Sequence, residues 1–399
     1  MDLCPVCQAS SVVRRIDFGA QPISNRYLAF DTHPGPLYPL QLGQCTRCAL
    51  LFLVNPPPVE ELVSRYDWIT YLEPEAHLDD LAEILAKLPG LSPESRLCGL
   101  TDKDDSTLAR MQRRGFSRSH RLDPLTDLEL SAGAGLETIQ GRIRPEGVPA
   151  WRTRWGPCDL IIGRQILEHT FAPTRFITAL KQLLAPGGYL VFEVPDSEQA
   201  LTDLDYLMIW EQHTLYFTMA TLIGTLNGYG LDVVWSGVFP YASENSLVAI
   251  ARLGTPRTLA PATAAAECAR AERYSAHFAE RAQSLRTALS QHRQAGGKVA
   301  LLGAGHLACA FLSIYGLGDL IEFVADDHPP KIGLYLPGSR LPILPSSALV
   351  EHGITWCLLT MRPDREEAVI DRQRPFLESG GQFFSILPAS PRHLEIRHG

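Results

Sequence analysis

Two C-x2-C pairs near the start of the chain constrain its fold more than any other feature: Cys4-Pro-Val-Cys7 and Cys45-Thr-Arg-Cys48. A C-x2-C turn directs two thiolates toward one tetrahedral ion, and two such turns complete a closed four-cysteine site that stabilises a small domain. Residues 8–44 separate the pairs, which exceeds the common spacing of about 15–20 residues and predicts an extra hairpin or loop. We predict structural zinc on these four cysteines, away from the chemistry. Accidental pairs or redox thiols are the alternative.

The composition excludes several classes of protein. The length of 399 residues suits two to three domains of roughly 150 residues each. Lys and Arg total 36 against 44 Asp and Glu, a net charge of -8 with no basic block, which argues against nucleic acid as a partner. The longest apolar run, residues 49–54, is far shorter than the ~18 residues of a membrane span. The first residues lack a signal-peptide pattern, so we expect a soluble, cytoplasmic protein with no membrane partner.

Three domains are expected, over residues 1–58, 59–253 and 254–399. The first holds both cysteine pairs and ends at Pro56-Pro57-Pro58, a stiff break between elements. In the second, strand-like runs such as 189–194 alternate with helical patterns. This alternation indicates βαβ units and a doubly wound parallel sheet, which places the chain in the α/β class.

The third expected domain is a smaller Rossmann-like unit. A charged helix over residues 266–294 precedes a strand at 298–302, and a second strand is expected at 321–327. Between them, Gly303-Ala304-Gly305 begins a G-x-G-x-x-A pattern, and Asp326 lies about 20 residues further on. That spacing alone is typical of a dinucleotide-binding turn, so NAD is a minor alternative ligand.

Several short motifs occur in a shared order along nearly the whole chain. They are the cysteine pairs with Pro22–Tyr27, Leu184–Gly188 with Phe192–Pro195, His213–Thr218, and Lys298–Gly305. In this order they resemble the three-part sugar C-methyltransferases. The resemblance implies a zinc-binding domain, a methyltransferase core that uses S-adenosylmethionine (SAM), and a Rossmann-like domain that holds the substrate. The implied reaction adds a methyl group to a carbon of a nucleotide-linked keto-sugar.

The expected cofactor loop departs from the glycine-rich turn of that family. It reads Gly99-Leu100-Thr101-Asp102-Lys103-Asp104-Asp105-Ser106, with Thr101 and Asp105 in place of glycines and three acids close together. Either these acids repel the methionine carboxylate unless Lys103 compensates, or the loop takes another shape and still binds SAM. The resemblance implies four cofactor contacts: Thr101, Asp123 on the ribose, Gln165 and Leu167.

The catalytic strip of the family resembles Tyr-x-Glu-His followed by an aromatic pair. Here the strip reads Trp210-Glu211-Gln212-His213-Thr214-Leu215-Tyr216-Phe217. We expect His213 to be the general base, because an imidazole accepts a proton near neutral pH, and Tyr216 to donate a hydrogen bond to the oxyanion. Glu168 and His169 are the next catalytic candidates, at the carboxyl end of an expected strand.

Three residues are expected to contact substrate: Glu193, Asn245 and His306. Asn245 lies where the family has a stretch that ends in an arginine, a natural phosphate contact that is absent here. The leading hypothesis is a SAM-dependent C-methyltransferase that acts beside a carbonyl of a small molecule, linked to a nucleotide or to a carrier. The alternatives are another enolate-type reaction, such as isomerisation, cyclisation or elimination, and a binding pseudoenzyme.

Overall fold

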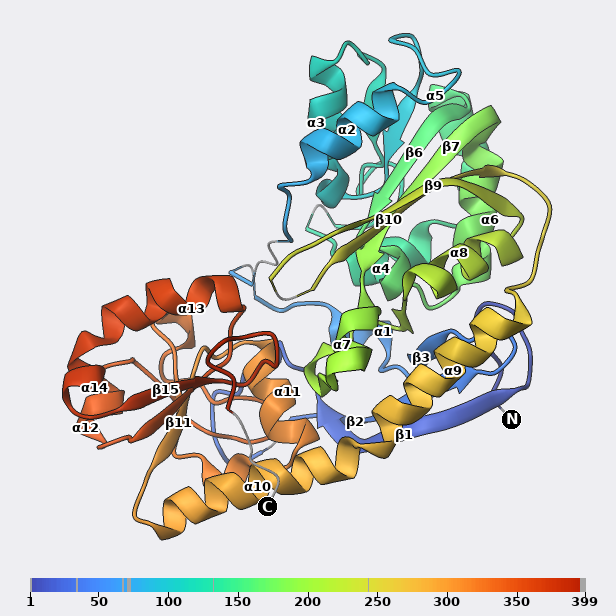
Figure 1. Cartoon of the computed structure of the whole chain (residues 1–399). Coiled ribbons are helices and arrows are strands. Elements are labelled where there is room, and N and C mark those ends of the chain that lie inside the picture. The colour runs from blue at the N-terminus through green and yellow to red at the C-terminus, as the bar shows by residue number, and fades with distance from the viewer. Residues whose placement is uncertain are drawn as a thin grey trace.

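A computed structural model describes residues 2–394 except 34, 67, 70–72, 132 and 243. Among the described residues the strands form three sheets, arranged as two lobes with the N-terminal strands below the upper lobe and beside the C-terminal one (Figure 1). Helices α9 (Pro261–Ala276) and α10 (Phe278–Gln294) run along the lower edge of the molecule (Figure 1). The single helix expected over residues 266–294 is therefore two helices, which meet at His277.

The N-terminal sheet is antiparallel and has the order β1-β2-β3-β8. Strands β1 (Val12–Pro22) and β2 (Leu37–Cys45) form the long hairpin expected between the cysteine pairs, and β3 (Leu51–Leu53) follows the second pair. The fourth strand, β8 (Leu215–Tyr216), comes from the expected catalytic strip. The cysteine-bearing sheet and this strip are thus one hydrogen-bonded structure.

The middle sheet has the order β5-β4-β6-β7-β10-β9, with the first four strands parallel. Its strands are β4 (Leu97–Gly99), β5 (Ser119–Arg121), β6 (Cys158–Arg164), β7 (Leu184–Pro195), β9 (Leu231–Phe239) and β10 (Ser246–Leu253). The helices of this part are α2 (Leu78–Ala86), α3 (Asp105–Arg113), α4 (Leu136–Arg142), α5 (Val148–Trp155), α6 (Pro173–Leu183), α7 (Ser197–Asp203) and α8 (Met219–Gly228). The central strands are buried on both faces, as a doubly wound sheet requires.

The C-terminal sheet is parallel throughout, in the order β13-β12-β11-β14-β15. Its strands are β11 (Val299–Leu302), β12 (Val324–Ala325), β13 (Ile343–Leu344), β14 (Trp356–Leu359) and β15 (Gln382–Ser385). Its helices are α11 (His306–Ile314), α12 (Ala348–Glu351), α13 (Pro363–Ile370) and α14 (Arg374–Glu378). The strand expected at 321–327 is only two residues long.

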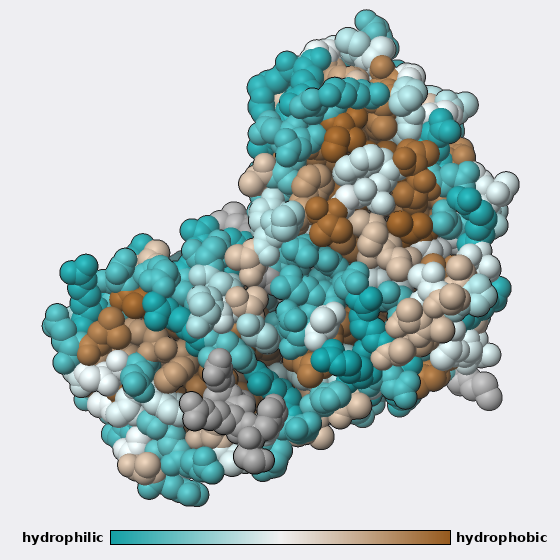
Figure 2. All heavy atoms as spheres, in the orientation of Figure 1, coloured by the Kyte–Doolittle hydropathy of each residue, from teal (hydrophilic) through white to brown (hydrophobic). Residues whose placement is uncertain are grey.

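The N-terminal sheet packs against the C-terminal part as well. One apolar core contains Ile16 and Leu42 of the N-terminal sheet together with Ala308 and Leu312 of α11. The surface is hollowed between the two lobes (Figure 2), where a pocket of about 180 Å³ is lined by residues of both, including Tyr241 and Asp364. In the described part of the chain, no helix has the length and apolar character of a membrane span.

Candidate functional site

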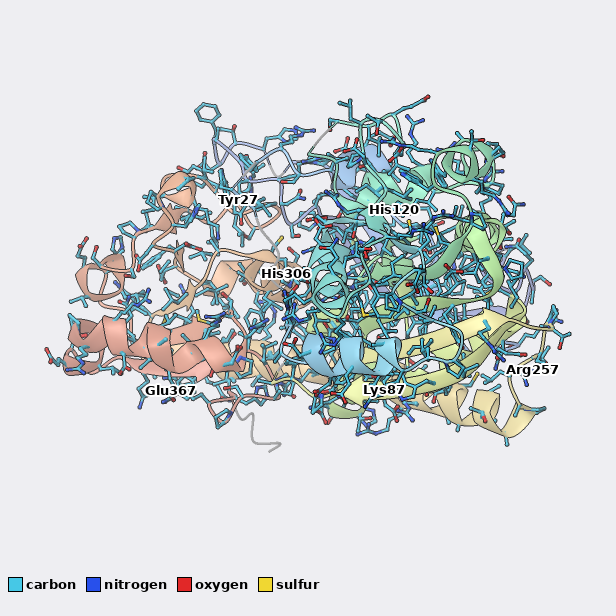
Figure 3. All side chains as sticks on the ribbon, turned by 90° about the horizontal axis from the view of Figure 1, so that it is seen from above. Tyr27, Lys87, His120, Arg257, His306 and Glu367 are labelled. Atoms are coloured by element: carbon cyan, nitrogen blue, oxygen red, sulfur yellow. The ribbon has the colours of Figure 1, made fainter. Side chains whose placement is uncertain are left out.

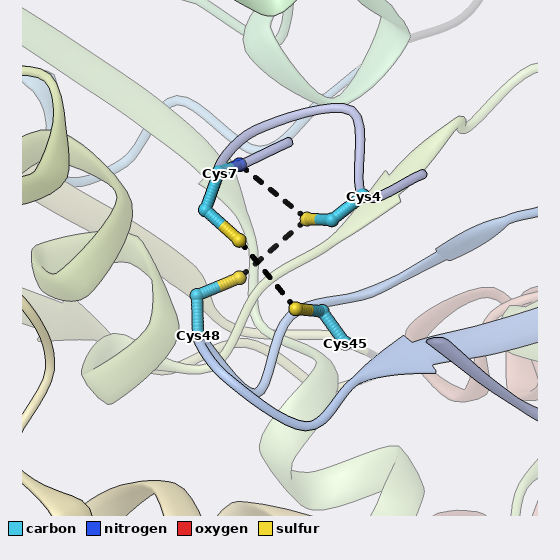
Figure 4. A group of neighbouring side chains, drawn as sticks. All are labelled: Cys4, Cys7, Cys45 and Cys48. Carbon is cyan, nitrogen blue, oxygen red and sulfur yellow. Dashed lines mark hydrogen bonds between the residues drawn. The ribbon is translucent and has the colours of Figure 1, made fainter. Parts of the chain in front are cut away.

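The four cysteines of the two pairs converge at one point (Figure 4). The Sγ atoms of Cys4 and Cys48 lie 3.6 Å apart, and those of Cys7 and Cys45 lie 3.5 Å apart. Sulfurs bound tetrahedrally to zinc at about 2.3 Å are separated by about 3.8 Å. The residue after each pair, Gln8 and Ala49, has a positive φ, which turns the chain back over the sulfurs. The donor set therefore fits structural zinc.

The expected catalytic residues form a second cluster, made of rings from three segments. His169 lies in the 3₁₀ turn Leu167–His169 after β6, and its ring centroid is 4.8 Å from that of His213. The ring of Trp210 lies 4.9 Å from His213 on one side and stacks on His306, the first residue of α11, at 4.9 Å. Figure 3 shows His306 at the junction of the C-terminal lobe with the rest.

Hydrogen bonds fix the backbone that carries this cluster. The amide and hydroxyl of Thr214 both donate to the carbonyl of Glu168, at 2.7 and 3.0 Å. The Tyr216 hydroxyl accepts from the amide of Trp210 and donates to its carbonyl, both at 3.0 Å. Tyr216 thus holds the turn that presents His213, and its hydroxyl is engaged there and not directed to an oxyanion.

Glu211 is held by the N-terminal segment of the chain. Its carboxylate accepts hydrogen bonds from both the amide and the hydroxyl of Ser24, each at 2.7 Å. The indole Nε1 of Trp210 also donates to the Ser24 hydroxyl, at 3.2 Å. Ser24 is part of the N-terminal segment, so that segment positions the catalytic strip directly.

Burial makes the titratable groups of the cluster neutral. The Glu168 side chain is buried, neither carboxyl oxygen has a hydrogen-bond partner among the described residues, and burial raises its pKa well above the usual range. Burial lowers the pKa of His213 well below 6.5, lowers that of His169 to about 3 and lowers that of His306 to about 4. One carboxyl oxygen of Glu168 and one ring nitrogen each of His169 and His213 all lie within 4.8 Å of one another. A neutral acid and two neutral imidazoles therefore face one point.

In the expected cofactor loop, the backbone amides donate their hydrogen bonds to an acidic side chain of the loop itself. The buried Asp104 carboxylate accepts hydrogen bonds from the amides of Leu100 at 2.7 Å, Thr101 at 2.9 Å and Arg164 at 2.8 Å. The Thr101 hydroxyl caps the 3₁₀ turn Asp102–Asp104 by accepting from the amide of Lys103. Of the three acids, only Asp104 is buried; Asp102 and Asp105 are exposed.

A buried ion pair lies next to this loop, between the last residue of β6 and a residue of β7. Arg164, which is 1% exposed, donates from Nε to the Glu193 carboxylate at 2.6 Å, and His77 lies 3.2 Å from that carboxylate. A second guanidinium nitrogen of Arg164 donates to the Lys103 carbonyl and to the Ser106 hydroxyl. Lys103 itself pairs with Glu73, at 2.5 Å. Glu193, expected to contact substrate, is thus held by Arg164 and His77.

The residues expected to contact the two ends of SAM differ in exposure. Asp123 is exposed just after β5, where the resemblance places the ribose, although its Oδ1 already accepts the amides of Leu125 and Thr126. At the amino-acid end, the side chains of Thr101, Asp104 and Arg164 are buried, and Asp104 takes the loop amides. In the conformation described here, Asp104 therefore occupies the loop amides where the resemblance places the methionine part of SAM.

The other expected ligand contacts are engaged within the chain itself. Gln165 has a positive φ and donates its amide to the Glu193 carbonyl, while Leu167 is a core residue. The Asn245 amide donates to Asp196. Asp326 accepts a hydrogen bond from the amide of Ala304 in the glycine turn and pairs with Lys331. Its carboxylate is therefore already engaged within the chain, whereas a bound dinucleotide would need it for the ribose.

Sequence reasoning missed the roles of Arg164, His77 and Ser24. Arg164 carried a detectable signal, because an arginine at the end of an apolar strand that enters a core must find an anionic partner. His77 and Ser24 are distant in sequence from the groups they bind, and no local pattern marks them.

Comparisons with known proteins agree with this architecture. Three family models match the chain: a zinc binding domain over residues 4–62, a methyltransferase domain over residues 51–235, and a C-methyltransferase C-terminal domain over residues 259–388. The C-methyltransferase NovU of Streptomyces niveus is 28% identical, over 97% of this chain and 96% of its own length.

Solved structures match less of the chain. The 1,6-didemethyltoxoflavin-N1-methyltransferase of Burkholderia thailandensis is 18% identical, with a TM-score of 0.31, over 45% of this chain and 79% of its own. The CcbJ methyltransferase of Streptomyces caelestis is 12% identical, with a TM-score of 0.30, over 47% of this chain and 100% of its own.

The fold and the family models define the class: an enzyme with a methyltransferase core behind a zinc-binding domain. Within this class, the match to a C-methyltransferase C-terminal domain and the similarity to NovU point to the C-methyltransferases. The chain thus carries, in order, a zinc binding domain, a methyltransferase domain and a C-methyltransferase C-terminal domain, and it is similar to a C-methyltransferase over nearly its whole length.

Proposed function

We propose that this enzyme removes a proton from a carbon beside a carbonyl of a small-molecule substrate, so that the carbon can be methylated. The observation that carries the proposal is the meeting of neutral His213 with neutral Glu168, within 4.8 Å. Carbon methylation at such a position requires a base for the C–H proton and a hydrogen-bond donor for the enolate oxygen.

His213 is the base in this proposal. Its lowered pKa keeps the imidazole neutral at physiological pH, so a ring nitrogen has a lone pair for the proton. Trp210 and His169 pack against its ring and fix its orientation. The C–H electron pair passes into the enolate, and the proton stays on His213 until it is released.

Glu168 takes the role that we expected for Tyr216. Its raised pKa keeps the carboxyl group protonated, and a buried neutral acid donates a strong hydrogen bond to a developing oxyanion. The family has a glutamate at the position of Gln212, so in this chain Glu168 supplies the carboxyl group that Gln212 lacks. His306 stacks on Trp210 from the C-terminal lobe, and we propose that it contacts the substrate.

A second candidate function is an enolate reaction without methyl transfer. The observation that favours it is the self-occupied loop, in which Asp104 takes the amides of Leu100 and Thr101. Both functions begin with the same proton transfer. In the first the resulting carbanion is methylated, and in the second it reacts without gaining a methyl group.

Mass spectrometry separates the two functions. The full chain would be incubated with a panel of nucleotide-linked keto-sugars, with and without SAM. We expect a product heavier by one methylene unit with SAM present, and none with His213→Asn, while the exposed His33→Asn serves as control. A product of unchanged mass that forms equally without SAM would favour the second function. A nucleotide-linked keto-sugar is the proposed substrate class; a carrier-linked keto acid is the further class to include.

We also propose a cytoplasmic location. All nine cysteines are free, as a reducing compartment favours.

A further inference from the structure

Three potential metal ligands meet at a place that neither the zinc site nor the ring cluster includes. They are Cys98, His120 and Cys158, and one donor atom of each lies within 4.8 Å of the others. Both cysteines are fully buried, and His120 is partly exposed. Figure 3 labels His120 on the lobe of the middle sheet.

The sheet register brings these residues together. Cys98 of β4 lies directly opposite His120 of β5, and β6, which begins at Cys158, pairs with β4 on its other side. A register shift between Cys158 and Leu160 places Cys158 in the same core as Cys98, whereas Leu160 belongs to the core of the other face. Three parallel strands thus aim their side chains at one spot, without any flexible loop.

The imidazole of His120 carries an unsatisfied group. Its Nε2 is buried and has no hydrogen-bond partner among the described residues, which costs free energy in an apolar core. The Trp155 ring lies 4.4 Å from the imidazole centroid and holds it in place. An orphaned ring nitrogen beside two thiols is the arrangement that a soft metal ion satisfies.

The charge of these three ligands and their number also suit a zinc ion. Two thiolates and one neutral imidazole balance a divalent cation without leaving net charge in the core. Cys2His sets with one open position are known ligands of zinc. Since β5 is the outer strand of the sheet, the His120 side of the cluster lies at the sheet edge, and water is the natural fourth ligand.

We propose that Cys98, His120 and Cys158 bind a second zinc ion, in addition to the one on the four N-terminal cysteines. This proposal is independent of the reaction at His213.

Metal counting on the full chain tests the proposal. The chain would be purified, loaded with excess Zn²⁺, passed through a desalting column and analysed by elemental mass spectrometry. We expect two zinc ions per chain, one in Cys158→Ser, and two in the control Cys357→Ser, which removes a buried cysteine of β14 that lies in no such cluster. A count of one for the unaltered chain, or of two for Cys158→Ser, would overturn the proposal.

Substitutions of His120 keep the test decisive if Cys158→Ser fails to fold. His120→Ala removes a partly exposed ligand, and we expect it to lose one ion. His120→Cys replaces the imidazole by a thiolate, and we expect it to keep two ions. An equal count in these two variants would show that His120 is not a ligand. A Cys98–Cys158 disulfide, detected by mass spectrometry of the alkylated chain in place of the second ion, would also overturn the proposal.

Discussion

At the scale of single residues, neutrality is the property that matters most in the ring cluster. Burial keeps His213 deprotonated and Glu168 protonated, so each group is in the form that its proposed role requires. The sequence motif identified His213 and His169 as neighbours of the chemistry, and the structure brings their rings together. The use of the Tyr216 hydroxyl within its own turn could not be predicted, because it depends on where the Trp210 backbone lies.

The first prediction concerns the base itself. His213→Asn should lower kcat by about 10²–10⁴-fold, because general base catalysis contributes that much, with little change in the free energy of unfolding. Steady-state kinetics measures the effect, and His33→Asn is the matched surface control. Wild-type kcat in His213→Asn would remove this residue from the mechanism.

The second prediction concerns pH. A base with an ordinary pKa near 6.5 loses activity as the pH falls below 7, because it becomes protonated. The lowered pKa of His213 keeps it neutral there, so kcat/KM should stay level between pH 7.5 and 6.0. A decline in kcat/KM with a midpoint near pH 6.5 would contradict a buried neutral base.

At the scale of elements, the loop after β4 shows how far a sequence pattern can mislead. The run of three acids predicted crowding, yet Asp102 and Asp105 face solvent, and Asp105 pairs with Arg121. Of the three, Asp104 alone is buried, because its carboxylate accepts hydrogen bonds from three backbone amides. The parallel strands and their helices were predictable from buried runs and helical spacing. The shape of the loop was not predictable, because it depends on amides just after β4 and on one at the end of β6.

The third prediction concerns cofactor affinity. In Asp104→Asn the charge that opposes the methionine carboxylate is removed with little change of shape, so SAM should bind more tightly than to the unaltered chain. Calorimetry at pH 8.5 is suitable, because burial raises the pKa of Asp104 to about 7 and the carboxylate is ionised above it. Asp102→Asn, on the exposed side of the loop, should change nothing. Equally tight SAM binding by the unaltered chain would show that the loop opens without help.

The fourth prediction concerns the buried pair between β6 and β7. Arg164→Ala leaves the Glu193 carboxylate buried without its guanidinium partner, beside His77 and the Gln165 side-chain amide, so the free energy of unfolding should fall by about 3–5 kcal/mol. Arg257→Ala removes a partner of Asp232 in an exposed pair and should cost less than about 1 kcal/mol. Urea denaturation of both variants makes the comparison. Similar small losses in the two would show that the Arg164–Glu193 pair is not structural.

At the scale of the whole molecule, the zinc-binding sheet and the catalytic strip are continuous. Strand β3 follows the second cysteine pair closely and pairs with β8, and Ser24 binds Glu211 within the strip. The order of the three parts was predictable from motifs along the chain. Their mutual packing was not, because contacts such as that of the Tyr27 hydroxyl with the Ala304 carbonyl join residues far apart in sequence.

The fifth prediction follows from that continuity. Cys45→Ser should lose the N-terminal zinc ion and lower the free energy of unfolding by more than about 2 kcal/mol, because structural zinc contributes directly to folding. Elemental analysis and thermal unfolding measure the two effects. A Cys45→Ser chain that loses the N-terminal ion and yet keeps the stability of the unaltered chain would show that the four cysteines serve another purpose.

Hydrogen–deuterium exchange at the substrate carbon tests the central claim most directly. A nucleotide-linked keto-sugar that binds the enzyme would be incubated in D2O without SAM and followed by NMR. If His213 removes the proton beside the carbonyl, the unaltered chain should exchange that proton for deuterium, and His213→Asn should slow the exchange by about 10²–10⁴-fold while still binding the sugar. Exchange at the same rate in both proteins would contradict the account.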